Sequence, residues 1–274
     1  MNYIGTLESN YYANPNGLAF DFTDKSEVTF IQFQGMGENS NIITDVVSFW
    51  KNVVFHKLKK KINVIIIKDN RLHGLHTGHY TANYHGVVGA VDNIWELCQL
   101  LNDKLYLKNG TTKRTVVFAD CGGSIPAILT SILVPYHSMN FTNPYLTVLS
   151  PNNEFEVTSN GMWYAKDTCV YAHENLQDYQ PWFETLQYFD NYTKNPNVQL
   201  NLHWATNLIG SDLLFRNEAE RLPKRVNIKI TDHNVPSNIE SHLLEKYLFQ
   251  NRKYLKLVTD EVKAQYAIVE TVNA

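Results

Sequence analysis

Residues 115–130 read T-V-V-F-A-D-C-G-G-S-I-P-A-I-L-T. The stretch opens with a short apolar, β-branched run, which is typical of a buried strand. A sharp turn of small residues around Cys121 follows, and Ile125–Leu129 then predicts the start of a helix, with Pro126 tolerated in its first turn. A strand, a tight turn and a helix form a nucleophile elbow, which needs small neighbours because the turn holds the nucleophile at a strained backbone angle. The sequence therefore predicts Cys121 as a nucleophile; the alternative is an ordinary buried cysteine beside a Gly-Gly turn.

At this segment the chain resembles the α/β-hydrolase family, whose elbow usually reads G-x-S-x-G. Ala119 stands at the first glycine of that pattern and Cys121 at the serine. By pattern, the resemblance extends over roughly residues 28–250. It implies an α/β fold with a mainly parallel sheet, helices on both faces and a cap insertion. The core would comprise residues 1–150 and 193–274, and the aromatic-rich residues 151–192 would form the cap.

Apolar runs and helical periodicity predict the other elements of the sheet. Strands are expected at Tyr3–Leu7, Leu18–Phe22, Val28–Phe33, Asn63–Asp69, Tyr145–Ser150, Val198–Trp204 and Val226–Ile230. Helices are expected at Ile42–Leu58, Val87–Leu107 and Ile239–Phe249, with an amphipathic segment from Lys253 onwards. The first two strands would form an antiparallel hairpin. The alternation of the later strands with helices indicates a parallel sheet.

Two further residues complete a catalytic triad under this resemblance. Asp212 lies in the loop after the predicted strand Val198–Trp204, where the family places its acid, and His233 follows the last predicted strand, where the family places its histidine. The order Cys121, Asp212, His233 is the family's order of nucleophile, acid and base. Asp232 is a second candidate for the acid, and His203 is a weaker candidate for the base.

The resemblance also implies an oxyanion hole. The loop that begins with Gln34-Gly35 takes the place of the family's His-Gly loop, so the backbone N–H groups of Met36 and Gly122 would bind the carbonyl oxygen. The thiolate of Cys121 would then attack an ester, thioester or amide. Asp120 precedes the nucleophile and departs from the usual pattern. Its charge would disfavour the thiolate if it pointed inward.

The predicted function is that of an esterase- or thioesterase-like acyl hydrolase or an acyltransferase, with a small-molecule acyl substrate. A cysteine elbow forms a thioester intermediate, which makes transfer to a sugar or natural-product acceptor a serious alternative to hydrolysis. A non-catalytic relative that binds a partner through an aromatic cap is the second alternative. Oligomeric state is left open.

Composition narrows the remaining function classes. With 24 Lys and Arg against 27 Asp and Glu, the net charge of −3 argues against a nucleic-acid or anionic-membrane surface as the main partner. The three cysteines, Cys98, Cys121 and Cys169, are too few for a disulfide framework and favour a reducing compartment. With no apolar signal core and no long apolar span, a cytoplasmic protein without a membrane helix is expected.

A run of four histidines offers a metal-binding alternative. It comprises His73, His76, His79 and His85. A zinc site needs three or four converging ligands, and histidines three apart in a glycine-punctuated loop are not held on one face. The run is therefore interpreted as a loop at the pocket rim, and neither a metal nor a cofactor is predicted.

Overall fold

The computed structural model describes residues 11–13, 19–21, 26–33, 59–60, 62–67, 94–106, 111–144, 189, 193–208, 210–221 and 227–272. These residues build a sheet with the strand order β1-β2-β4-β3-β5-β6-β7-β8. The strands are β1 (Tyr11–Ala13), β2 (Ala19–Asp21), β3 (Val28–Phe33), β4 (Asn63–Ile67), β5 (Arg114–Asp120), β6 (Ser138–Thr142), β7 (Gln199–Ala205) and β8 (Asn227–His233). The helices are α3 (Ile94–Leu105), η3 (Cys121–Gly123), α4 (Ser124–Ser131), α8 (Gly210–Arg221), η6 (Ser241–Leu243), α9 (Leu244–Gln250) and α10 (Lys253–Val272).

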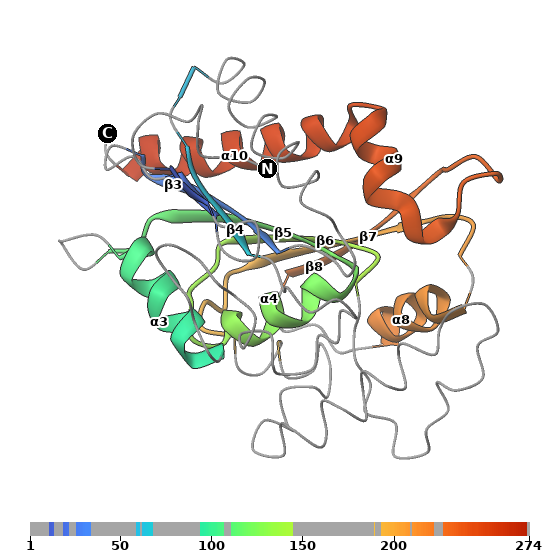
Figure 1. Ribbon diagram of the computed structural model, residues 1–274, viewed down its shortest axis with the longest axis horizontal. Coiled ribbons are helices and arrows are strands. Elements are labelled where there is room, and N and C mark those ends of the chain that lie inside the picture. The colour runs from blue at the N-terminus through green and yellow to red at the C-terminus, as the bar shows by residue number, and fades with distance from the viewer. Residues whose placement is uncertain are drawn as a thin grey trace.

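The sheet is mainly parallel. Strands β4, β3, β5, β6, β7 and β8 pair in parallel, while β2 runs antiparallel to both β1 and β4. Figure 1 shows α3, α4 and α8 below the sheet and α9 and α10 above it. The predicted fold class, a mainly parallel α/β sheet with helices on both faces, is confirmed.

Alternation of side chains along each strand divides the apolar residues between two cores. In β3, Ile31 and Phe33 join the larger core, which α3, α4 and α8 cover, and which we call the α4-side core. Val28 and Phe30 belong to the α10-side core under α9 and α10. The central strands therefore carry apolar residues on both faces, as buried parallel strands do.

Strand β6 lies at Ser138–Thr142, and the strand expected at 145–150 lies outside the described residues. Its apolar residues Met139 and Phe141 enter the α4-side core. The alternate residues are polar, and Asn140 accepts a hydrogen bond from Asn201 of β7 at 2.8 Å on the other face. With only two apolar residues among its five positions, β6 gives a weak sequence signal, and the sequence analysis missed it.

The structure also bears on the expected hairpin, the cap range and the terminal segment. The hairpin partner of β2 is Tyr11–Ala13, whereas the predicted strand 3–7 and helix 42–58 lie outside the described residues. Phe189, the single described residue of the predicted cap range 151–192, is fully buried in the α4-side core. The terminal segment forms α10, which packs on β5 and β3. None of the described helices combines the length and the apolar character needed to cross a lipid bilayer.

Candidate active site

The carboxyl ends of β5 to β8 meet at one edge of the sheet. The parallel register pairs Asp120 with Thr142, Thr142 with His203, and His203 with Thr231. Ligands of open α/β sheets bind in the crevice outside this edge. The predicted nucleophile, acid and histidine all follow or end one of these strands, so each lies near the edge where chemistry is expected.

Cys121 follows β5 directly and has a positive φ of 48°. A non-glycine residue with this backbone angle is strained, and such strain concentrates at functional sites. The turn is closed by Ser124, whose Oγ donates a hydrogen bond to the Cys121 carbonyl oxygen at 2.7 Å. The chain then enters η3 and α4, so Cys121 lies at the start of a helical segment whose dipole favours an anion. The side chain of Cys121 is 4% exposed and contributes to the α4-side core.

The carboxylate of Asp120, which the sequence left unexplained, is held by the neighbouring strand. Thr142 Oγ1 donates a hydrogen bond to Asp120 Oδ1 at 2.7 Å. Along β5 the side chains alternate, so Asp120 shares the α10-side face with Phe118, and Ala119 points to the opposite face. Asp120 is therefore part of the polar contacts between β5 and β6.

His233 is the last residue of β8 and not, as the sequence predicts, a residue beyond the strand. It pairs in register with Ala205 of β7. Its Nε2 lies 3.0 Å from Nδ1 of His203, within hydrogen-bond distance. Strand β8 is three strands away from β5, a lateral separation of about 14 Å at the usual strand spacing. That separation exceeds the combined reach of a cysteine and a histidine side chain.

Burial sets the protonation of this histidine pair. Burial, together with the charges of His233 and Lys229, lowers the pKa of His203 to about 3. Burial and the charge of Lys253 also lower the pKa of His233, although the carboxylate of Asp232 opposes them. His203 is therefore neutral at pH 7, and Nε2 of its ring is buried without a hydrogen-bond partner.

The two candidate acids have different surroundings. Asp232 is bound by Arg216, whose Nε and Nη2 donate to its carboxylate oxygens at 3.0 and 2.8 Å. Because Asp232 and His233 are successive residues of a strand, their side chains point to opposite faces. Asp212 lies in the first turn of α8 rather than in a loop, is 1% exposed, and accepts a hydrogen bond from Ser241 Oγ at 3.3 Å. Asp212 is therefore buried against the segment that follows β8, whereas Asp232 is bound to Arg216.

The segment after β8 returns across the edge of the sheet. Asn207, just beyond β7, donates a hydrogen bond from Nδ2 to the Ile239 carbonyl oxygen at 2.8 Å. Asn143, just beyond β6, donates from Nδ2 to the Ser241 carbonyl oxygen, also at 2.8 Å. These two contacts carry the chain back from β8 over β7 to β6, the strand beside β5.

The returning segment contains His242, a histidine that the sequence analysis did not consider. His242 is the second residue of η6 and directly follows Ser241, the residue that contacts both Asn143 and Asp212. Asp120 and Thr142 are the last paired residues of β5 and β6, and Cys121 and Asn143 are the residues that follow them. The contact between Ser241 and Asn143 therefore places the backbone next to His242 at the end of β6, the strand that neighbours β5. The Pro- and Asn-containing segment of residues 234–240 is the sequence signal that could have indicated such a return.

Some of the remaining predicted site residues lie within the described part of the chain and others lie outside it. Gly122 follows Cys121 as the second residue of η3, where its N–H remains a predicted oxyanion donor. Met36, Cys169 and the histidine run 73–85 lie outside the described residues. Cys98 is buried on α3, and burial raises the pKa of its thiol to about 12, which agrees with a structural role. In the described part of the chain, no group of three or more His, Cys, Asp or Glu residues is placed to bind a metal ion.

Comparison with known proteins finds similarity in structure alone. No protein-family model and no curated protein sequence matches the chain. Among solved structures, a Glycosylation Associate Protein (Gap123) complex from Streptococcus agalactiae matches with a TM-score of 0.55 and 12% identity, over 88% of this chain and 44% of that one. The chain therefore spans less than half the length of that protein.

The peroxisomal α/β-hydrolase Lpx1 from Saccharomyces cerevisiae matches with a TM-score of 0.48 and 12% identity, over 89% of this chain and 81% of that one. The capsule O-acetyltransferase of Neisseria meningitidis serogroup A matches with a TM-score of 0.50 and 12% identity, over 94% and 97% of the two chains. At these identities, the match to the S. agalactiae complex and the match to the O-acetyltransferase show a shared fold.

Proposed function

We propose that the chain is an enzyme of acyl chemistry that hydrolyses or transfers the acyl group of an ester or thioester through a covalent intermediate on Cys121. The observation that carries the proposal is the positive φ of Cys121 at the junction of β5 with a helical segment. A strained, non-glycine residue at that junction is the geometry of a nucleophile elbow. A cysteine that only packs in the core does not require a positive φ.

The first half of the reaction forms the acyl-enzyme. The Cys121 thiolate attacks the carbonyl carbon, a carbon–sulfur bond forms, and the carbonyl electron pair moves to the oxygen. The N–H groups of Gly122 and Met36 would stabilise that oxyanion. When the intermediate collapses, the leaving alcohol or thiol takes a proton from a histidine. In the second half, water or an acceptor hydroxyl gives its proton to the same histidine and attacks the thioester, which releases Cys121.

Asp212 is the acid of this proposal, because it is a buried carboxylate on the element that follows β7 and contacts the returning segment. For the histidine, the sequence predicts His233. The contacts favour His242, since its neighbour Ser241 is hydrogen-bonded to Asp212, whereas the ring of His233 lies against His203 three strands from β5. The two histidines make distinguishable predictions.

Transfer and hydrolysis share the acyl-enzyme and differ in what attacks it. A thioester in a dry site passes its acyl group to acceptors other than water more readily, and Cys121 is almost fully buried. One of the structural neighbours is named as a capsule O-acetyltransferase. Acetyl transfer to a sugar hydroxyl or a natural-product hydroxyl is therefore the second reaction to assay.

The test is a panel of short acyl esters and acyl-coenzyme A thioesters, each with and without sugar acceptors. Turnover should disappear in Cys121→Ala and persist in part in Cys121→Ser, since a serine can still form an acyl-enzyme. Full activity in Cys121→Ala would refute the mechanism. If no substrate turns over and iodoacetamide labels Cys121 no faster than Cys98, the chain is a non-catalytic binding protein with the same fold.

A paired substitution identifies the histidine. His242→Ala should lower kcat/KM by about 10²–10⁴, the usual contribution of a general base, while His233→Ala should change it by less than about tenfold. The reverse pattern would assign the role to His233. If both variants keep wild-type activity, the chain does not use a triad.

A further inference from the structure

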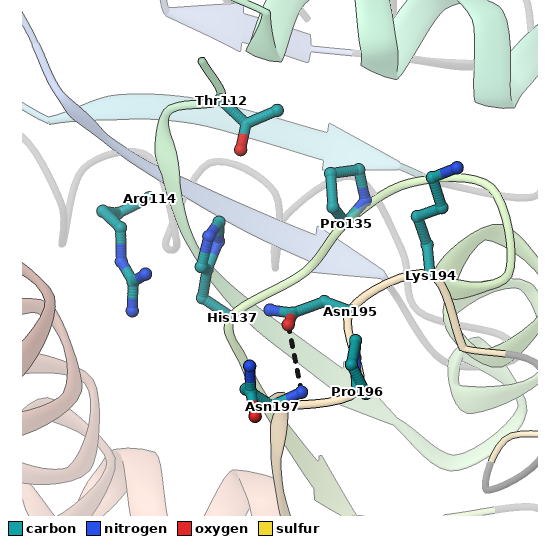
Figure 2. A pocket seen from close by; sticks show the side chains of 8 residues that line it. All are labelled: Thr112, Arg114, Pro135, His137, Lys194, Asn195, Pro196 and Asn197. Atoms are coloured by element: carbon teal, nitrogen blue, oxygen red, sulfur yellow. Dashed lines mark hydrogen bonds between the residues drawn. The ribbon is translucent and has the colours of Figure 1, made fainter.

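A pocket lies at the edge of the sheet opposite to Cys121. It has a volume of about 330 Å³ and takes its lining from the starts of three neighbouring strands. Arg114 is the first residue of β5, His137 precedes β6, and Lys194 to Asn197 precede β7, as Figure 2 shows. Because β5 separates Arg114 from Cys121, the pocket is about 20 Å from the elbow. It is therefore distinct from the proposed active site.

Arg114 supplies most of the positive charge. Its Nε donates to Gln265 Oε1 at 2.9 Å, and no contact described for this side chain joins its terminal nitrogens to a carboxylate. Burial lowers the pKa of the Arg114 guanidinium, which shows that the charged group is partly removed from water. A guanidinium carries five N–H donors in a planar fork, so the terminal nitrogens keep donors for a ligand.

His137 adds a neutral donor. Its Nδ1 accepts a hydrogen bond from the backbone N–H of Thr115 at 3.3 Å, so Nδ1 carries no proton and the ring proton is on Nε2. Burial and the charge of Arg114 lower the pKa of His137 to about 4, so the ring stays neutral at pH 7. The Nε2–H group is thus a fixed hydrogen-bond donor among the residues that line the pocket.

The lining contains two cations and no acidic residue. Lys194, in the segment before β7, is exposed. Further polar groups come from Thr112, Asn195 and Asn197. Glu261, which lies near this edge, accepts a hydrogen bond from Ser138 Oγ at 2.6 Å and does not line the pocket. A half-desolvated guanidinium with nearby N–H donors and no carboxylate is suited to an oxygen anion, which arginine binds in a bidentate manner.

We propose that this pocket binds the oxyanion group of a small metabolite, a phosphate or a carboxylate, through the guanidinium of Arg114 and the Nε2–H group of His137. Its volume is at the lower end of the range of small-molecule sites, so it would enclose the anionic group and a few further atoms. The proposal does not depend on the chemistry of Cys121, and it predicts binding that Cys121→Ala leaves intact.

The test is isothermal titration calorimetry with inorganic phosphate and, separately, with citrate, at pH 7.5 and constant ionic strength. Saturable binding is expected for at least one anion, and the anion that binds more tightly identifies the class. Arg114→Gln should raise the Kd by about tenfold or more, the loss of a charge-assisted hydrogen bond, whereas His137→Phe should raise it about two- to fivefold. The matched control Arg252→Gln removes an exposed arginine elsewhere and should leave the Kd unchanged.

Three results would overturn the proposal: no saturable heat with either anion, an unchanged Kd in Arg114→Gln, or equal weakening in Arg252→Gln. Circular dichroism would show whether Arg114→Gln still folds after losing its bond to Gln265. If it does not, His137→Phe decides, because it removes the Nε2–H donor and keeps an aromatic ring, and an unchanged Kd there refutes the site.

Discussion

Glycine in place of alanine should cost much less stability at position 121 than at an ordinary buried strand position. The residue has φ of 48°, an angle that glycine adopts freely and that costs an L-residue about 1–2 kcal/mol. Glycine also loses about 0.4–1 kcal/mol through the greater freedom of its unfolded chain, and about 0.8 kcal/mol because it lacks the methyl that alanine buries at this position, where Cys121 is 4% exposed. These effects nearly cancel, so Cys121→Gly and Cys121→Ala should agree in stability to within about 1 kcal/mol.

The measurement is urea unfolding of the two variants, compared at equal m-values. The matched control is Ala119→Gly, two residues earlier in β5, where the side chain is 1% exposed and φ is not positive. There the same chemical change should lose about 1 kcal/mol or more, because glycine weakens a strand and a buried methyl is removed.

The difference in the cost of glycine between the two positions is the critical result. If Cys121→Gly is less stable than Cys121→Ala, by an amount similar to the loss in Ala119→Gly, then the backbone at Cys121 is not strained, and the argument for a nucleophile elbow fails. Both variants at Cys121 lack the thiol and should be inactive, so the comparison measures strain separately from chemistry.

Two further predictions concern buried titratable groups. The folded-state pKa of His203 is about 3 and that of an unfolded histidine is near 6.5, so its neutral form contributes stability that is complete above about pH 6.5 and lost as the pH falls towards 3. Urea midpoints should therefore fall between pH 7 and pH 5, and less so in His203→Gln; an equal fall in both would assign the loss to other groups. The thiol of Cys98, with a pKa raised to about 12 by burial, should react with a thiol reagent only after denaturant is added, and rapid labelling in native buffer would contradict its place in the core.

Much of the central sheet follows from local sequence. The runs around Phe30, Ile65, Val117 and Leu202 predict β3, β4, β5 and β7 to within about two residues. Strands β3, β4 and β5 carry apolar residues on both faces, as strands buried on both sides do, and β7 has the alternate apolar residues Leu200, Leu202 and Trp204. The elbow is equally local, since its strand, small residues and helix adjoin one another in the chain. These features required no knowledge of distant contacts.

The composition of the site is decided by contacts between distant segments. The hydrogen bond from Asn143 to the Ser241 carbonyl oxygen joins residues 98 positions apart, and the contact between Ser241 and Asp212 spans 29 positions. No local pattern encodes such side-chain bonds. Strand β6 was missed because only two of its five residues are apolar, and His233 was expected beyond its strand because the predicted strand ended three residues early. The local pattern of the chain predicted the strained turn at Cys121. The contacts on which the proposed acid and histidine rest were decided only by the tertiary structure, because hydrogen bonds across the sheet edge join segments that are far apart in the chain.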